Sequence, residues 1–328
     1  MDFSLSNFME KITFQEPRTK ENLVIFPLMV NNGEEELPAY LLLDEAFEMG
    51  VLEIKEVSPE GSVNTVVILN NADEPVLILD GEEILGAKQN RMVNATILIA
   101  AKEKVEVPVS CVERGRWHYS SPVFNRAGVF GYSTLRRQKA QQVSESLQFS
   151  REFAADQGAI WEEIDRKQAR MGISSSTDAL HEVYESYEEK LENFISGLKP
   201  LPGQSGVAVF INNRFVCLDL FARPETLSKL WSKLLKSYAM EAIEAGEEKK
   251  SPRKADLKKV LGAIKASECS TYSSVGLGSD LRLRGPGVTG AGLIFKEKLL
   301  HLCVFGSSGE KRRSSRMEAP SRRRRNLE

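Results

Sequence analysis

Apolar residues alternate with polar ones through much of the first third of the chain, as expected for half-buried β-strands. Clusters rich in Asn, Pro and Gly separate these segments at short intervals and predict turns. Strands are expected over Leu23–Val30, Ala39–Leu43, Val51–Val57, Val63–Leu69, Val76–Leu79, Arg91–Ala100 and Val105–Val112. Short strands at this spacing predict an antiparallel sandwich or roll.

The hydrophobic period becomes helical between Thr134 and Leu198, where three helices are expected, and it returns to strands after Pro200. The later elements expected are strands over Val207–Ile211, Phe215–Phe221, Asp280–Arg284 and Leu293–Phe305, and helices over Glu225–Ala245 and Asp256–Ala266. The predicted fold class is α+β. It combines an N-terminal antiparallel β sandwich or roll, a helical middle, and a C-terminal β-hairpin–helix unit packed on it.

Composition favours an ordinary soluble protein, with 328 residues, 41% hydrophobic and 27% charged. We expect a lead-in over residues 1–20 and a single domain over 21–306, with a β part (21–130), a helical part (131–200) and an α/β part (201–306). No apolar run approaches the length of a membrane span, and the N-terminus lacks the pattern of a secretory signal. The four cysteines form no C-x-x-C pair. They favour free thiols and a cytoplasmic location.

Charge is distributed unevenly along the chain. The net charge is −2, but the segment after Gly306 holds eight Lys and Arg against three Asp and Glu, which leaves about −7 for the rest. This composition predicts a disordered basic tail over residues 307–328. The tail either contacts nucleic-acid phosphates or is a solvated end. The acidic body argues against a broad nucleic-acid-binding face, and no membrane partner is expected.

The densest chemistry lies between Asp80 and Trp117, where two β-like segments each end in a charge. A hairpin with its turn near Lys102 would place both apolar faces on the same side. The expected pairs are Arg91 with Glu113, Val93 with Cys111, and Ile99 with Val105. A register that pairs Arg91 with Gly115, or a bulge, would make the Arg–Glu pair diagonal.

Several polar side chains gather at the open end of this hairpin and form a candidate site. The candidate ligand-binding residues are Gln89, Asn90, Arg91, Cys111, Arg116 and Trp117, and the candidate catalytic carboxylates are Glu83 and Glu113. The arginines would hold an anion, and Trp117 would stack on a ring. Glu83 or Glu113 would supply a general base. The alternative is a structural ion pair that closes the end of the sheet.

No cofactor can be assigned from sequence motifs. Three histidines are too few for a His-based metal site, and the carboxylates show no recognisable Mg²⁺ or Mn²⁺ ligand spacing. The Gly-rich stretch Ser274–Gly292 matches neither a P-loop nor a dinucleotide-binding fingerprint. The cofactor therefore stays unknown, and no metal ligand is proposed.

Two motifs carry a family resemblance. GEEILGAKQNR (Gly81–Arg91) and VSCVERGRW (Val109–Trp117) resemble the ARPP family, the ADP-ribosylglycohydrolase and rhodanese-phosphatase-superfamily-associated protein domain. A looser match is GVAVFINNRFVCLDLF (Gly206–Phe221). The family name refers to gene neighbours, so the resemblance implies a link to ADP-ribose or nucleic-acid metabolism. It assigns no reaction and no catalytic residue.

These features lead to two functional hypotheses. The first is a cytosolic enzyme or binder that acts on a phosphate-bearing nucleotide-type ligand, linked to ADP-ribose or RNA metabolism. The second is a non-catalytic interaction or scaffold module whose Arg and Glu cluster is a structural ion network. The sequence leaves open whether the chain is an enzyme. An open pocket at Arg91 and Glu113 would favour the first hypothesis, and a filled, fully paired network would favour the second.

Overall fold

The computed structural model describes residues 3–31, 38–246 and 252–307. Its helices and its sheets, which are antiparallel except for one parallel pair of strands, confirm the predicted α+β class. Apart from Ser307, the predicted basic tail lies outside the described residues. Within the described chain, no helix combines the length and hydropathy needed to cross a membrane.

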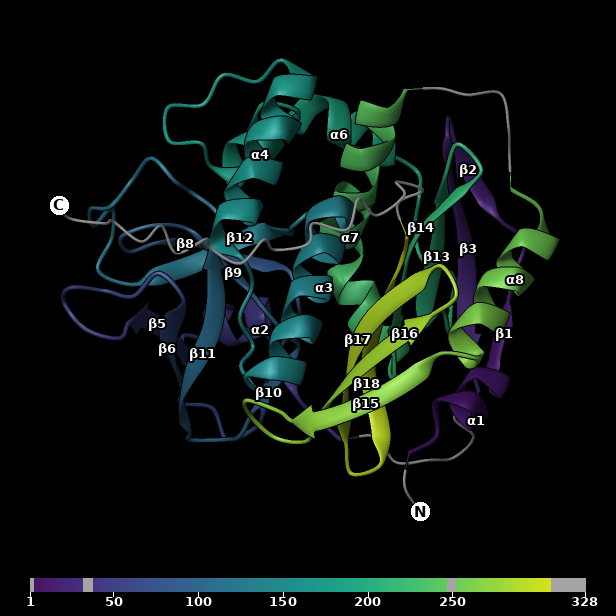
Figure 1. Ribbon diagram of the computed structural model, residues 1–328, viewed down its shortest axis with the longest axis horizontal. Helices are drawn as coiled ribbons and strands as arrows, with labels where there is room; N and C mark the ends of the chain where they lie inside the picture. The colour runs from purple at the N-terminus through teal and green to yellow at the C-terminus, as the bar shows by residue number, and fades with distance from the viewer. Residues whose placement is uncertain (1–2, 32–37, 247–251, 308–328) are drawn as a thin grey trace, which may run out of the picture.

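The larger sheet joins the two ends of the chain (Figure 1). Its strands are β1 (Ile12–Phe14), β2 (Arg18–Lys20), β3 (Leu23–Val30), β13 (Gly206–Ile211), β14 (Arg214–Phe221), β15 (Glu268–Ser273), β16 (Ser279–Gly285), β17 (Val288–Phe295) and β18 (Lys298–Gly306). They are ordered β1-β3-β13-β14-β18-β17-β16-β15, with β2 also paired to β3. The segment expected as a lead-in thus contains a short helix and two strands. The strand β3 pairs both with its sequence neighbours β1 and β2 and with the distant strand β13.

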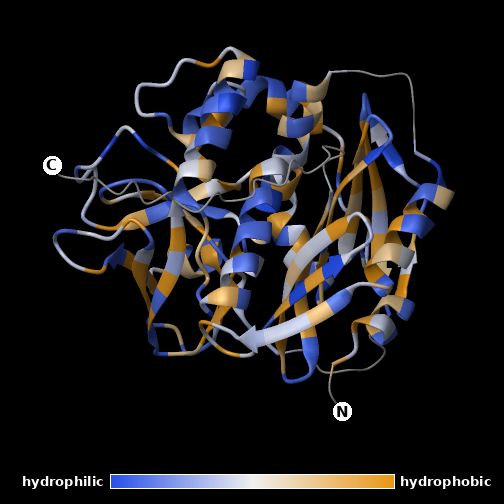
Figure 2. Ribbon diagram, in the orientation of Figure 1, coloured by the Kyte–Doolittle hydropathy of each residue, from blue (hydrophilic) through white to orange (hydrophobic). Residues whose placement is uncertain are grey.

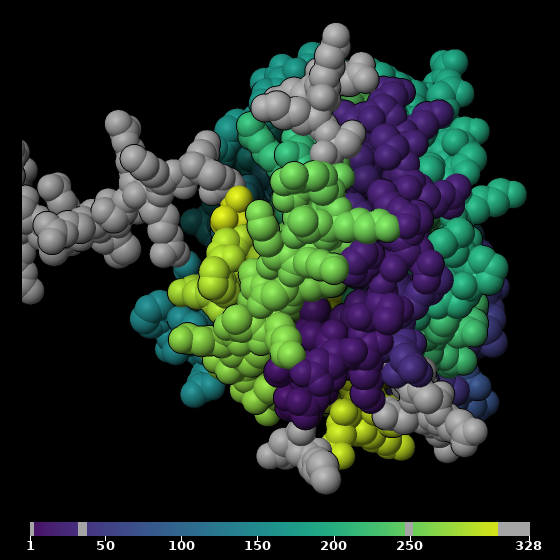
Figure 3. Space-filling model, turned by 90° about the vertical axis from the view of Figure 1, so that its right-hand side faces the viewer, coloured from purple at the N-terminus to yellow at the C-terminus, as the bar shows by residue number. Residues whose placement is uncertain are grey.

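Helices cover both faces of this sheet. On one face lie α1 (Leu5–Glu10) and α8 (Lys254–Lys265), which are adjacent in Figure 3. On the other lie α3 (Ser133–Phe149) and α7 (Pro224–Ala245). Alternate residues of β13 enter different cores, Val207 beneath α7 and Ala208 on the α8 side. Period-two alternation therefore builds two hydrophobic layers from one sheet, and Figure 2 shows apolar positions along its strands.

The remaining N-terminal strands form a closed barrel and a small companion sheet. The barrel strands are β5 (Leu52–Glu56), β6 (Thr65–Asn70), β8 (Glu82–Gly86), β9 (Arg91–Val93), β11 (Lys104–Cys111) and β12 (Phe124–Phe130), and the companion strands are β4 (Leu41–Leu42), β7 (Val76–Ile78) and β10 (Ile97–Ile99). The barrel closes in the order β11-β6-β5-β12-β8-β9. Buried Ile54, Ile68, Ile84, Val107 and Phe124 belong to its core. The barrel is therefore packed with side chains rather than hollow.

The described part of the chain contains four further helices: α2 (Leu43–Glu48), α4 (Gln157–Met171), α5 (Leu180–Glu185) and α6 (Glu188–Ile195). The third helix expected in the middle of the chain is divided into α5 and α6 near Ser186. The expected β13–β14 hairpin is confirmed. Its turn residues Asn212 and Asn213 have φ of 47° and 65°, a left-handed conformation that Asn tolerates.

The expected hairpin over residues 91–112 forms only in part. The strands β9 and β11 are adjacent and antiparallel, but Arg91 pairs with Cys111 rather than with Glu113, and Val93 pairs with Val109. The chain bends after Val93, and β10 pairs with β7 instead of continuing along β11. The expected pair of Ile99 with Val105 is therefore wrong, because Val105 pairs with Ile68 of β6 to close the barrel. The observed register differs from the expected one by two residues, and such a shift leaves each side chain on the same face of the sheet.

Two buried cations of α3 connect the barrel side to the large sheet. Arg136 makes a bidentate ion pair with Asp219 of β14, at 2.6 and 3.1 Å. Lys139, one helical turn further on, pairs with Asp80 just before β8. All four side chains are fully buried. Tyr238 of α7 also donates a hydrogen bond to Asp219, at 2.5 Å.

These contacts determine the ionisation of Asp219. Burial alone would raise the pKa of its carboxyl group, but Arg136 and His301 outweigh that effect and hold the pKa well below its usual range. A carboxylate with a depressed pKa adds stability above its unfolded-state pKa. That stability is lost as the pH falls through the folded-state pKa.

We expect Asp219→Asn to lower the free energy of unfolding by about 3–5 kcal/mol, because Arg136 would be left buried without its counter-ion. The measurement is urea unfolding at neutral pH. The matched control is Asp73→Asn, whose exposed ion pair with Lys102 should contribute little. Equal stability of the two variants would contradict a central role for this ion pair.

Candidate functional site

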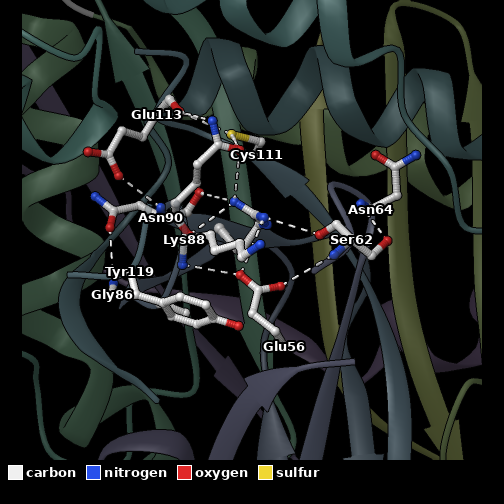
Figure 4. A network of polar contacts seen from close by, with 12 residues as sticks. Glu56, Ser62, Asn64, Gly86, Lys88, Asn90, Cys111, Glu113 and Tyr119 are labelled. Atoms are coloured by element: carbon white, nitrogen blue, oxygen red, sulfur yellow. Dashed lines mark hydrogen bonds and ion pairs between the residues drawn. The ribbon is translucent and has the colours of Figure 1, made fainter. Parts of the chain in front are cut away.

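Arg91 lies at one end of the barrel and is completely buried. Its Nη1 donates to the Gln89 carbonyl at 3.0 Å and to Gln89 Oε1 at 3.3 Å. Its Nη2 donates to the Ser62 carbonyl at 3.1 Å and lies 3.7 Å from Glu56 Oε1 (Figure 4). Among the described residues only Nε of this guanidinium lacks a partner. Both terminal nitrogens of Arg91 therefore already donate hydrogen bonds to protein oxygens.

Glu113 pairs with Arg116 rather than with Arg91. Arg116 donates to both carboxylate oxygens, at 2.6 and 2.8 Å, and the Asn90 amide N–H donates a third hydrogen bond at 2.9 Å. Burial raises the pKa of Glu113, but these donors outweigh it and lower the pKa overall. A well-satisfied carboxylate of low pKa is a weak general base. The main role of Glu113 in this geometry is therefore to pair with Arg116 and stabilise the structure.

Cys111 completes this interior network. Its thiol donates to Gln89 Oε1 at 3.0 Å, and burial raises its pKa. A buried thiol with a raised pKa is a weak nucleophile at neutral pH. The structure therefore brings Gln89, Asn90, Arg91, Cys111, Glu113 and Arg116 together, as the sequence predicts. It arranges them as a filled polar network, with Glu56 as a member that sequence analysis missed.

Outside this network, two aromatic rings remain accessible. Trp117 and Tyr119 are each 46% exposed. The Lys88 ammonium lies 5.3 Å from the centre of each ring. Arg91 lies 5.7 Å from the centre of the Trp117 ring, and the Tyr119 hydroxyl donates to the Pro59 carbonyl at 3.3 Å. We call Lys88, Trp117 and Tyr119 the aromatic shelf.

A second group of interest involves Glu83, on β8. Glu83 is fully buried, and neither of its carboxylate oxygens has a hydrogen-bond partner among the described residues. Nδ1 of His181, on α5, lies 3.4 Å from Oε2 of Glu83, an ion-pair distance without hydrogen-bond geometry. Nε2 of His181 lies 3.6 Å from Glu185, and the imidazole is 21% exposed. This pair therefore links a buried carboxylate to a ring that reaches solvent.

Both groups of the pair have shifted pKa values. Burial raises the pKa of Glu83, against the opposing effect of His181. Burial disfavours the charged imidazole, but Glu83 outweighs it and raises the pKa of His181. Glu113 acts electrostatically on both groups. A titratable pair with perturbed pKa values is typical of sites that transfer protons.

The sequence placed Glu83 among the candidate residues but missed His181. The only local signal for His181 in the sequence is its spacing from Glu185, which places both side chains on one helical face. Nothing local indicates that α5 packs over β8. The partner of Glu83 therefore comes from tertiary structure alone.

We expect Glu83→Gln to lower the pKa of His181, because burial would then be opposed only by the smaller effects of Glu185 and Glu113. An NMR titration can follow His181, one of three histidines in the chain. The control is Glu185→Gln, which removes a largely exposed carboxylate and should leave the pKa raised. An unchanged His181 titration in Glu83→Gln would contradict the pairing.

Comparison with known proteins is consistent with the resemblance seen in the sequence. Searches of curated proteins and of solved structures find no match. The family model described as the ARG and Rhodanese-Phosphatase-superfamily-associated Protein domain matches residues 11–305, which include the large sheet, the barrel and both groups described above. The chain therefore belongs to the ARG and Rhodanese-Phosphatase-superfamily-associated Protein family.

Proposed function

We propose that the protein binds a phosphate-bearing nucleotide-type ligand on the aromatic shelf. The observation that carries this proposal is the placement of one ammonium group, Lys88, 5.3 Å from two half-exposed rings. A base would stack on Trp117 or Tyr119, and the ammonium would attract a phosphate. The family name, with its reference to ADP-ribosylglycohydrolases, makes ADP-ribose the first ligand to test.

The filled network beneath the shelf supports this role by holding the shelf in place. Arg116 donates to the His118 carbonyl at 3.0 Å and to Ser120 Oγ at 3.0 Å. These bonds fix the chain on both sides of Tyr119. A ring held in place before binding loses less conformational freedom when the ligand arrives. In this proposal Arg91 and Arg116 position the shelf, and Trp117 and Lys88 contact the ligand.

If the bound ligand is hydrolysed, Glu83 and His181 are the groups we propose for proton transfer. Glu83 would orient the imidazole through Nδ1, and Nε2 would take a proton from an attacking water. Glu113 would remain an ionised partner of Arg116. This division of roles follows from the unsatisfied oxygens of Glu83 and the three donors to Glu113.

The second candidate function is a non-catalytic interaction module. The observation that favours it is the pairing of Arg91 and Arg116 with protein oxygens, since a filled network is sufficient to brace the end of the barrel. In that case the aromatic shelf would contact a protein partner instead of a nucleotide. The two functions differ in whether the shelf binds small nucleotides.

We expect Trp117→Ala to weaken binding of ADP-ribose by about 5- to 150-fold, because stacking of a base on an aromatic ring contributes about 1–3 kcal/mol. Isothermal titration calorimetry of the full chain with ADP-ribose, AMP and adenosine gives the affinities. Lys88→Gln should weaken ADP-ribose and AMP binding while leaving adenosine unaffected. The matched control is Phe149→Ala, which removes another exposed ring, 90% accessible.

Two results would count against the nucleotide proposal. One is the absence of measurable affinity of the wild-type chain for all three compounds. The other is equal affinity of Trp117→Ala and Phe149→Ala. Either result would favour the interaction module.

A further inference from the structure

A large groove lies on a part of the molecule that contains no barrel strand. Its volume is about 1250 Å³, above the range of about 300–1,000 Å³ usual for small-molecule pockets. The N-terminal turn of α3, the second half of α4 and the end of α7 contribute lining residues. The β13–β14 turn, α8 and the β16–β17 turn contribute the others. The groove is thus built from the helical layer and the large sheet.

Basic side chains dominate the charged lining of this groove. They are Arg137, Arg166, Arg170, Arg214 and Lys259, against Glu163 and Glu241. Both carboxylates already have partners within the protein. Glu163 accepts from Arg170 at 3.1 Å, and Glu241 accepts from the Thr134 amide N–H at 2.7 Å. Arg166, Arg170 and Lys259 are themselves paired with carboxylates, so the unbalanced positive charge of the groove comes from Arg137 and Arg214.

Two of these cations are available to a ligand. Arg137 is half-buried and Arg214 is exposed, and neither side chain makes a hydrogen bond or ion pair with any described residue. Buried arginines elsewhere in the protein, such as Arg91 and Arg136, are paired. A half-buried guanidinium without a counter-ion loses part of its hydration and gains nothing in return. An external anion would supply the missing interaction.

The charge of the rest of the chain adds a second indication. Gly306 and Ser307 line the groove, so the basic tail leaves the described structure at its rim. The groove and the tail carry the same sign of charge, whereas the chain as a whole carries a net charge of −2. Like charges argue against the tail as the occupant of the groove. They favour an anion from outside the chain as its occupant.

We propose that this groove binds the phosphate backbone of single-stranded nucleic acid. A positively charged groove that follows the backbone is the usual means of binding single strands without sequence preference. Phe215 and Val260 line the same groove and offer apolar contacts to bases. Arginine suits phosphate because its planar group can donate two parallel hydrogen bonds. The groove shares no residue with the aromatic shelf, so the failure of one proposal would leave the other unaffected.

The test uses the full chain and a fluorescein-labelled 12-nucleotide single-stranded RNA of mixed sequence, followed by fluorescence anisotropy over a range of salt concentrations. The double variant Arg137→Gln/Arg214→Gln should bind at least about five-fold more weakly, with a salt dependence reduced by about two counter-ions. The control, Lys104→Gln/Lys199→Gln, removes the same charge from exposed lysines outside the groove and should bind like the wild type. Thermal unfolding should be unchanged in both, since neither arginine has a partner to lose.

A third variant separates the groove from the tail. With Arg322–Arg325 all replaced by Gln, the full chain should still bind the RNA at low salt, and adding Arg137→Gln/Arg214→Gln should weaken that binding again. Three outcomes would overturn the proposal. They are equal affinity of the groove and control variants, loss of all binding in the tail variant, and competition by an acidic peptide as effective as competition by unlabelled RNA.

Discussion

The arrangement of the molecule depends on two cations that α3 carries into its interior. Arg136 and Lys139 are one helical turn apart, and each meets a carboxylate from a different part of the fold. Asp219 comes from the large sheet, and Asp80 precedes the first residue of a barrel strand. Both pairs form only when the barrel and the sheet pack against the same helix. Because an unpaired buried charge is strongly destabilising, other packings are disfavoured.

The strand β8 extends this constraint to the candidate site. Its adjacent carboxylates point in opposite directions, as successive residues of a strand do. Glu82 accepts from Lys233 of α7 at 2.7 Å, and Glu83 approaches His181 of α5. Lys233 therefore anchors the strand that presents Glu83. Each carboxylate oxygen of Glu82 accepts a hydrogen bond, whereas neither oxygen of Glu83 does so among the described residues, which leaves Glu83 free for the proposed proton transfer.

The sequence was most informative where the pattern is local. The bounds of β3 were predicted to the residue, and those of α7 and α8 to within two, because apolar periodicity and turn residues mark them. The strand β8 was missed. Glu82 and Glu83 follow a turn signal and would ordinarily be solvated, and they are buried only because Lys233 and His181 arrive from distant helices.

The register of β9 and β11 could not be predicted for a related reason. Hydrophobic alternation settles which side chains share a face, and Arg91 and Cys111 do lie side by side. It does not distinguish registers two residues apart. The choice among them comes from closure of the barrel, in which β11 pairs with β6 along its first half and with β9 along its second. That arrangement leaves Glu113 beyond the end of β11 and within reach of Arg116.

The charged groups of this fold fall into two sets. Groups whose charge is satisfied within the protein stabilise the fold, and groups whose charge is not satisfied are available for chemistry. Arg91, Arg116 and Glu113 were the most conspicuous residues in the sequence, and the protein itself uses nearly all of their hydrogen-bonding capacity. Glu83, Arg137 and Arg214 were less conspicuous, and each lacks the partners that its charge requires among the described residues. A folded chain can retain such groups when something outside it completes their interactions. We therefore place the proposed ligand contacts at the incomplete groups and the aromatic shelf, and not at the dense network at the end of the barrel.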